Sequence, residues 1–390
     1  MRDRIQEEYA CRFADELINE CAELIGKPAS FAIPATDDTL SSTLRRVARV
    51  TFPDWHLWAL PLVAHEYGQV VVQETILCRI VDELAQEASK PTFDILYEGL
   101  RSRLQSIEGG DLRTIAMDYL TRAEQEPGKA ADEIENLARI LQVDETGIGE
   151  LAQATAGQIR DCLSEATDRA RVLVADAFAT FTAGPAYACA TLILRLNPST
   201  PRLKGRPTDE ERARIILAVL AEMDASEPSP PFRKVRKSLE ASWKLLVEGS
   251  GIGESSAREE WHLDAAGVLT KIKYRMVRQD RSGYTRDDWL KAQRWSSDWW
   301  LAINNGKTPE IPVEVSGLCD VRLRDVLNAA WHCRLQIIEK LPPQDVNSAT
   351  DKVTDAARHL CDRILANRKQ LTDPLDFGGR APRPGKVRAK

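Results

Sequence analysis

The sequence predicts a mainly α-helical protein, and three features of its 390 residues lead to that expectation. Apolar residues recur at helical spacing, as in the face formed by Ile5, Tyr9, Phe13, Leu17 and Cys21. Short clusters such as Gly109–Gly110 and Pro127–Gly128 separate these stretches, as turns between helices do. Hydrophobic residues make up 43% of the chain, a normal fraction for a globular protein with a buried core.

The first ninety residues predict three helices. The first covers 3–26 and ends at Lys27-Pro28, and the second covers about 38–50. The third covers about 61–88, because Pro61 suits the first turn of a helix, where its missing N–H is not needed. Its first half is apolar nearly all round, which is typical of a buried helix.

The middle of the chain predicts a longer series of helices. Residues 92–168 have the pattern of three or four amphipathic helices, and the strongly apolar segment 161–196 must be kinked or split at Gly184-Pro185. After a loop at 197–209, Thr208 and Glu211 form a capping-box pattern that opens another helix.

The stretch 226–231, Ser-Glu-Pro-Ser-Pro-Pro, divides the predicted domains. We expect a helical core over 1–225, a Trp-rich helical region over 232–372, and a basic disordered tail over 373–390. Seven of the nine tryptophans follow residue 231. Within the Trp-rich region we expect one small β-hairpin element around 269–277, where apolar and basic residues alternate, and helices at about 285–304, 320–341 and 346–371.

Composition restricts the classes of function. The formal net charge of −6 argues against nucleic-acid binding by the whole chain. The N-terminus lacks the apolar core of a signal peptide, and no stretch has the roughly 18 apolar residues of a membrane span. The eight cysteines are scattered without the spacing of a zinc finger. We therefore expect a cytoplasmic protein that does not associate with a membrane; nothing in the sequence fixes its oligomeric state.

Two segments place charged groups where only apolar ones are expected. His65 and Glu66 interrupt the apolar helix, and Asp176 stands alone in the apolar run 171–187. A buried carboxylate must be paired, metal-bound or protonated. We expect the two helices to pack together so that Asp176 accepts a hydrogen bond from His65, a pairing that orients histidine ligands in metal sites.

These segments resemble the HExxH zinc metallopeptidases of the glutamate-zincin type, in particular bacterial ones. The resemblance covers about 50–225 and rests on four short motifs in order: His65-Glu66-Tyr67-Gly68, Ala175-Asp176, Gly184-Pro185-Ala186-Tyr187, and Arg206-Pro207 before Glu210-Glu211-Arg212. It implies a helical metallopeptidase-like core. In that family two histidines one helical turn apart and a downstream glutamate hold zinc, and the glutamate of the motif acts as general base.

The sequence departs from the family at its metal ligands. Gln69 stands at the second histidine, Val172 at the third-ligand glutamate, and Arg206 at a later histidine. The resemblance therefore implies a pseudoenzyme, in which His65 is a vestigial ligand and Glu66 a vestigial general base. Gln69 and Asp176 would form a structural polar network with them. We expect no cofactor, and zinc only if further residues, such as His56 with Asp176, complete a ligand set.

Three functions remain open at this point. The first is a catalytically inactive scaffold or regulator that binds a protein partner. The second is an active but atypical zinc-dependent hydrolase. The third is a plain helical protein without peptidase ancestry, in which His65 and Asp176 would lie far apart.

A tryptophan group supplies a candidate partner surface. Trp295, Trp299 and Trp300 follow Arg294 within one predicted helix, and Trp with Arg is typical of protein interfaces. The same helical spacing also fits ordinary core packing with cation–π contacts.

Overall fold

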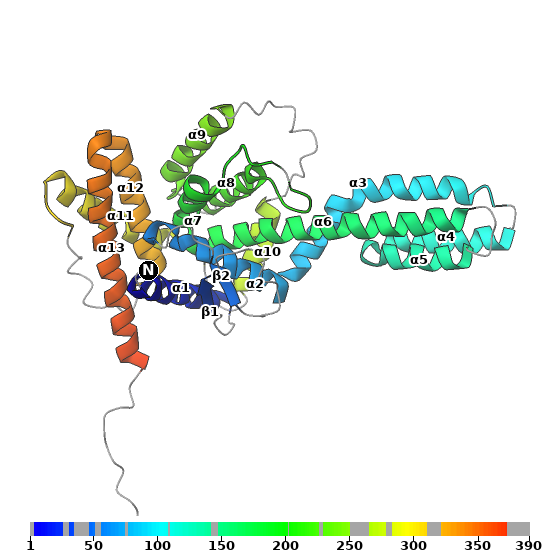
Figure 1. Cartoon of the computed structure of the whole chain (residues 1–390), viewed down its shortest axis with the longest axis horizontal. Coiled ribbons are helices and arrows are strands. Elements are labelled where there is room, and N and C mark those ends of the chain that lie inside the picture. The colour runs from blue at the N-terminus through cyan, green and yellow to red at the C-terminus, as the bar shows by residue number, and fades with distance from the viewer. Residues whose placement is uncertain are drawn as a thin grey trace, which may run out of the picture. The chain divides into compact units, whose positions relative to one another are not determined.

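The computed structural model describes residues 4–25, 31–34, 47–50, 56–74, 77–107, 110–141, 147–201, 203–225, 229–249, 265–277, 283–309 and 321–372. These residues are mainly helical, as the sequence predicts (Figure 1). The chain divides into two compact units, unit 1 at Met1–Leu290 and unit 2 at Lys291–Lys390. The division falls within one helix and not at the predicted linker 226–231.

Unit 1 begins with α1 (Arg4–Ile25) and two short parallel strands, β1 (Phe31–Pro34) and β2 (Val47–Val50), which pair with Phe31 opposite Val47. The helix expected at 38–50 is therefore wrong for Val47–Val50, where two β-branched valines lie in a strand. The remainder of that predicted helix, 38–46, lies outside the described residues.

The predicted helix 61–88 is divided in the structure. A 3₁₀ helix at Leu57–Leu62 leads into α2 (Val63–Glu74), and α3 (Cys78–Leu104) is a separate helix. Leu77, between the two, is still buried. The apolar pattern therefore continues across the division, so periodicity alone could not reveal it.

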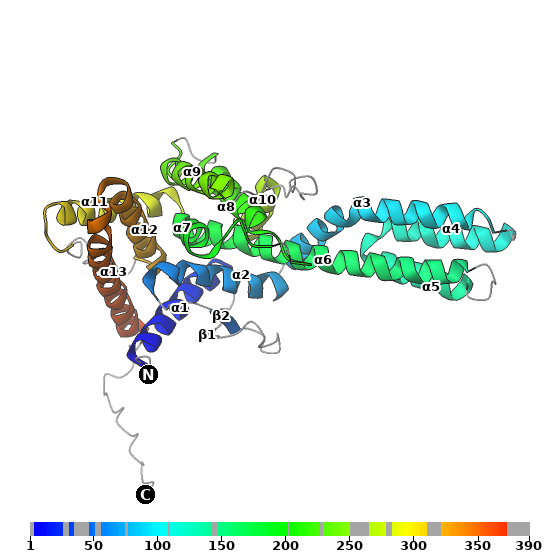
Figure 2. The same ribbon diagram turned by 45° about the horizontal axis from the view of Figure 1, so that its top comes forward.

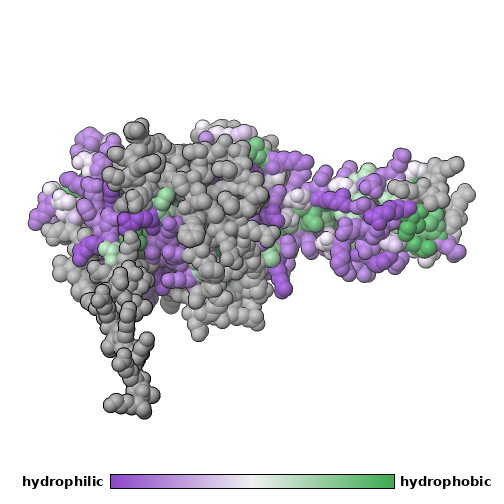
Figure 3. Space-filling view, turned by 60° about the horizontal axis from the view of Figure 1, so that its bottom comes forward, coloured by the Kyte–Doolittle hydropathy of each residue, from purple (hydrophilic) through white to green (hydrophobic). Residues whose placement is uncertain are grey.

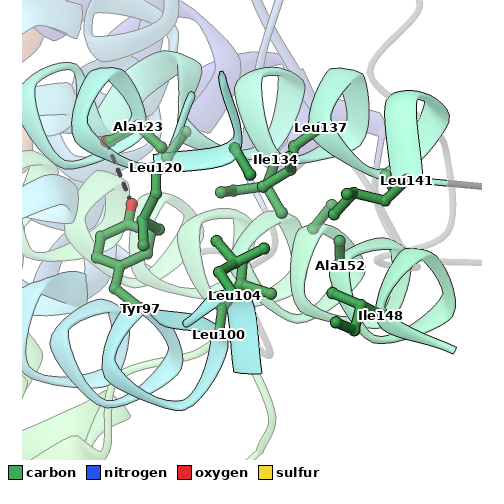
Figure 4. Packing of buried hydrophobic residues seen from close by; sticks show 14 of the residues in the cluster. Tyr97, Leu100, Leu104, Leu120, Ala123, Ile134, Leu137, Leu141, Ile148 and Ala152 are labelled. Atoms are coloured by element: carbon green, nitrogen blue, oxygen red, sulfur yellow. Dashed lines mark hydrogen bonds between the residues drawn. The ribbon is translucent and has the colours of Figure 1, made fainter. Parts of the chain in front are cut away.

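Four helices form an arm within unit 1, defined here as α3, α4 (Gly110–Gln125), α5 (Ala130–Leu141) and the first half of α6 (Ile148–Ala183). Figures 1 and 2 both show these helices side by side. Their common core combines aliphatic side chains and small alanines with the rings of Phe93 and Tyr97, and Leu120, Ile134, Leu137 and Leu141 are all fully buried (Figure 4). A 3₁₀ turn at Pro127–Lys129 joins α4 to α5.

The second half of α6 leaves the arm and enters the rest of unit 1, where it packs against α2 and α8 (Asp209–Ala225). It ends at Gly184, as the sequence predicts, and α7 (Pro185–Ala190) and a π-helical turn (Thr191–Arg195) follow. Gly184 has φ 69° and ψ −154°, a conformation reserved for glycine. A Cβ atom there would lie 2.4 Å from Cδ1 of Tyr284, so the break also requires glycine for space.

Residues beyond the predicted linker still belong to unit 1. The backbone N–H of Phe232 donates to Asp224 of α8 at 2.8 Å, and α9 (Arg233–Gly249) packs against α7 and α8. The β-hairpin expected at 269–277 is wrong, because these residues lie in α10 (Ala265–Val277). Val268, Leu269 and Ile272 are all buried, and their spacing is helical.

Unit 2 consists, in its described part, of the end of α11 (Arg286–Asn304), α12 (Leu323–Lys340) and α13 (Pro343–Thr372), close to the predicted ranges. α12 packs against α13. Trp295 and Trp299 are buried, whereas Arg294 is exposed and Trp300 is half-buried with the Lys340 ammonium 5.0 Å from its ring centre. The predicted basic tail 373–390 lies outside the described residues.

Candidate functional site

A buried carboxylate, Asp176 of α6, is the meeting point of four elements of unit 1. His65 of α2 lies with Nδ1 2.8 Å from Oδ1 of Asp176, an ion-pair contact that brings the two residues together as predicted. Arg212 of α8 donates through Nε to Oδ2 at 2.8 Å and through Nη2 to Oδ1 at 2.9 Å. The hydroxyl of Tyr187, on α7, also donates to Oδ1. These four residues, with Gln69, are called the Asp176 centre below.

The close approach of α2 and α6 depends on Gly68. A Cβ atom at this position would lie 3.1 Å from the carbonyl oxygen of Ala175 and 3.2 Å from Cδ1 of Phe178. Glycine therefore lets the backbone of α2 lie directly on α6, one residue from Asp176. The Gly68 of the sequence motif is thus a packing residue that brings His65 to its carboxylate partner.

The other two partners are positioned by local signals that the sequence carries. The side chain of Thr208 accepts from the backbone N–H of Glu211 at 3.2 Å, and Glu211 accepts from the N–H of Thr208 at 2.8 Å. This capping box fixes the start of α8, and Arg212 follows in its first turn. The break at Gly184 redirects the chain into α7, which places Tyr187 on Asp176.

The charge of Asp176 is stabilised by its partners. Burial alone raises the pKa of a carboxyl group, but Arg212 and His65 outweigh it and hold the pKa of Asp176 well below its ordinary value. Burial and the neighbouring carboxylate raise the pKa of Tyr187, so this side chain stays a neutral donor. Burial acts to lower the pKa of Arg212, yet Asp176 raises it, so the pair is ionised in the core.

Both ring nitrogens of His65 have a close polar neighbour. Nδ1 lies 2.8 Å from the Asp176 carboxylate, and Nε2 accepts a hydrogen bond from the amide Nε2 of Gln69 at 2.8 Å. His65 is 1% exposed. Nε2 is the atom that would face a metal when Nδ1 binds a carboxylate, and here the amide of Gln69 takes that place.

Glu66 lies outside the Asp176 centre. Its Oε1 accepts from Nη1 of Arg195 at 2.9 Å, and the two side chains are 15% and 31% exposed. Arg195 is the last residue of the π-helical turn, a structure often found at functional sites. The expected general base is thus held by a guanidinium and does not contact His65 through any hydrogen bond the structure defines.

The residues around His65 do not fit a zinc ion. Gln69 occupies Nε2 of His65, and Val172, one turn before Asp176 on α6, offers no donor. Within the described residues, no group of three His, Cys, Asp or Glu side chains is arranged to hold a metal. His56, the alternative ligand, is exposed at the start of the 3₁₀ helix Leu57–Leu62.

Sequence reasoning missed the roles of three residues at this site. It named Tyr187 and Arg212 only as parts of motifs, and it did not single out Arg195. One signal was available for Arg212: a lone buried carboxylate needs a cation, and Arg212 directly follows the capping box of α8. No signal in the sequence pairs Arg195 with Glu66, because the two are 129 residues apart.

The tryptophan group does not form a surface. Trp295 is 7% and Trp299 0% exposed, so both act as core residues and only Arg294 and part of Trp300 of the predicted interface reach solvent. The alternative of core packing fits these two tryptophans.

Comparisons with known proteins identify no relative. No family model matches the chain, and neither a curated protein nor a solved structure is detectably similar to it. Among the helices that the structure describes, none combines the length and apolar character needed to cross a bilayer.

Proposed function

We propose that this chain is a catalytically inactive, metallopeptidase-like protein of the cytoplasm that binds a protein partner as a scaffold or regulatory component. The observation that carries the proposal is the hydrogen bond between Gln69 and Nε2 of His65. In a working HExxH site that nitrogen binds the metal. Here Gln69, at the position of the second ligand, donates a hydrogen bond to this nitrogen, so a ligand position has become a structural one.

The pairing of Glu66 supports the same proposal. A general base must reach a water molecule and accept its proton. Glu66 instead accepts from Arg195 at 2.9 Å, so Oε1 of this carboxylate is already engaged by a guanidinium. The helices are kept in place by Asp176, Arg212 and Tyr187, so the packing persists without the metal.

The partner surface that we favour is the exposed surface beside the Asp176 centre. We call this surface the mouth of the centre and define it as Glu66, Gln69, Ile193, Leu194 and Arg195. All five side chains are at least partly exposed, and Ile193 and Leu194 are 43% and 37% exposed. Apolar side chains beside an Arg–Glu pair are a common composition for a protein interface. The buried Trp295 and Trp299 make the Trp-rich region the weaker choice.

Restoring the missing ligands tests the metallopeptidase-like core. We expect Gln69→His with Val172→Glu to bind about one equivalent of zinc, and the parent less than about a tenth, by elemental mass spectrometry without chelator or added metal. Gln69→His with Val172→Leu is the control, since it supplies one ligand fewer. If the double variant folds and binds no more zinc than its control, the peptidase-like core is refuted. Nearly one equivalent in the parent would favour the atypical hydrolase.

The binding role needs a separate measurement. Affinity purification of the tagged chain from its native cells should recover a partner in fixed stoichiometry, and Ile193→Asp with Leu194→Asp should lose it. Ile95→Asp on α3 is the matched control, because Ile95 is 74% exposed but lies on the arm. Equal recovery with both variants would remove the mouth as the partner surface.

A further inference from the structure

α9 presents two different faces. Val235, Leu239 and Trp243 are buried, and the helix packs through them against the rest of unit 1. Four basic residues are exposed along the remainder of the helix and are called the α9 basic face: Arg233, Lys234, Lys237 and Lys244. The whole chain has a formal net charge of −6, so a basic face is a local departure from its overall charge.

The arrangement of these residues is regular. Arg233, Lys237 and Lys244 are separated by four and seven positions, which aligns them on the side opposite the buried residues. The acidic residues of α9 cancel only part of the charge. Glu240 accepts from Arg236 and Glu248 lies 3.7 Å from Lys244, so the five basic and two acidic residues of the helix leave it a net charge of +3.

One leucine borders the basic face at the end of the helix. Leu245 is 68% exposed and follows Lys244 directly, on the side of the helix that carries Lys234. A basic face with a large apolar side chain beside it is typical of helices that lie at the surface of anionic bilayers. Nucleic-acid binding would instead favour exposed aromatic rings, and the tryptophan of α9, Trp243, is buried.

We propose that α9 docks unit 1 on an anionic lipid surface, with Arg233, Lys234, Lys237 and Lys244 facing the headgroups and Leu245, at the edge of this face, entering the interface. This contact departs from the expectation of no membrane association, which rested on the lack of a membrane-spanning stretch in the sequence, because a peripheral contact needs no such stretch. It is independent of the proposed function, because none of these residues belongs to the Asp176 centre or its mouth.

Vesicle co-sedimentation of the full chain tests the proposal. The probes are phosphatidylcholine vesicles with and without about 30% phosphatidylglycerol. The parent should bind only the anionic vesicles, and binding should weaken strongly between low and high salt because exposed charges are screened. No binding to either vesicle, or equal binding to both, would overturn the proposal.

Variants identify the face responsible. Lys237→Gln with Lys244→Gln should lower the partition coefficient about 30-fold, since each basic residue near an anionic surface contributes about fivefold. Arg103→Gln with Arg113→Gln is the control: both arginines are exposed on the arm, and the change in net charge is the same. Equal loss in the two pairs would mean that charge in general, and not α9, controls binding.

Leu245 separates a bilayer from other anionic partners. Leu245→Ser should weaken vesicle binding and leave its salt dependence in place. Thermal melts of every variant establish that the fold is intact, and the parent's salt and lipid dependence tests the proposal even if a variant unfolds. If a single-stranded oligonucleotide binds in a Lys237- and Lys244-dependent way while anionic vesicles do not, the face belongs to nucleic acid and the proposal is wrong.

Discussion

The two halves of α6 are stabilised in different ways. Its first half lies in the arm, where Ile148 and Ala152 (Figure 4), together with Ala156 and Ile159, pack into an apolar core. Its second half carries Asp176, whose charge is neutralised by Arg212 and supported by His65 and Tyr187. One continuous helix of 36 residues therefore joins an apolar core to a charged one.

This difference determines how much stability each core loses when one of its side chains is replaced. An aliphatic core loses stability gradually as volume is removed, because neighbouring side chains partly close the cavity. A buried ionic cluster loses much stability at once, because removal of one partner leaves another charge in the core uncompensated. The arm keeps its charges at the surface, as in Arg160–Glu135, and Figure 3 shows that the visible face of the arm is mostly hydrophilic with small apolar patches.

The largest effect should come from Asp176→Asn. This substitution keeps the volume but leaves the buried guanidinium of Arg212 without a counter-charge, so we expect a loss of about 3–5 kcal/mol in the free energy of unfolding. Asp168→Asn is the control on the same helix. Asp168 pairs with Arg171 in an exposed i,i+3 pair, and its loss should cost no more than about 0.5 kcal/mol in chemical denaturation. Similar curves for the two variants would contradict a charged core.

The pH dependence of stability in the parent and in Asp176→Asn gives a second test of the charged core. The pKa of Asp176 is lowered in the folded state, so its contribution is present above the unfolded pKa of about 3.9 and is lost as pH falls below it. The stability difference between parent and Asp176→Asn should stay constant from neutral pH to about 4.5. It should then shrink by up to about 1.4 kcal/mol per pH unit. A difference that changes between pH 5 and 8 would implicate another group.

The sequence predicted the arm better than the centre, for a physical reason. The arm helices have amphipathic periodicity, and the divisions near Gly110 and Pro127 follow local signals. The predicted end at residue 88 is wrong, because α3 continues through Pro91 to Leu104. The break at Gly184 and the capping box at Thr208 were predicted for the same reason.

The centre depends on contacts that no local pattern fixes. The pairing of His65 with Asp176 could be predicted, because both charged groups interrupt apolar helices and each needs a partner. The pairing of Glu66 with Arg195 could not, because both residues are partly exposed and have water as an alternative partner. The helix α10 was mistaken for a strand because Ile272, Tyr274 and Met276 alternate with basic residues, whereas the buried Val268, Leu269 and Ile272 follow helical spacing.

Truncation of the arm core should have the next largest effect. Leu137 is 0% exposed, and Leu137→Ala should cost about 2–4 kcal/mol through lost contacts and a cavity. Hydrogen exchange followed by mass spectrometry should report faster exchange throughout the arm and little change around Asp176, if the two cores unfold separately. Leu151→Ala, at a leucine that is 38% exposed, is the control with little change expected. Equal acceleration around Asp176 would mean that α6 couples the two cores into one cooperative unit.

The smallest expected effects come from alanine substitutions at two glycines of unit 1. Their comparison is the most direct test of the packing between α2 and α6. Gly157 lies on the arm half of α6, and a Cβ atom added there would have nothing within 4 Å, so Gly157→Ala should stabilise the protein by about 0.5–1 kcal/mol through helix propensity. Gly68→Ala makes the same propensity gain, but its methyl group meets the Ala175 carbonyl at 3.1 Å. Overpacking of about 1–3 kcal/mol should outweigh that gain. Opposite signs in thermal melts would support backbone contact between α2 and α6 as the requirement that places His65 on Asp176, and a stabilised Gly68→Ala would refute it.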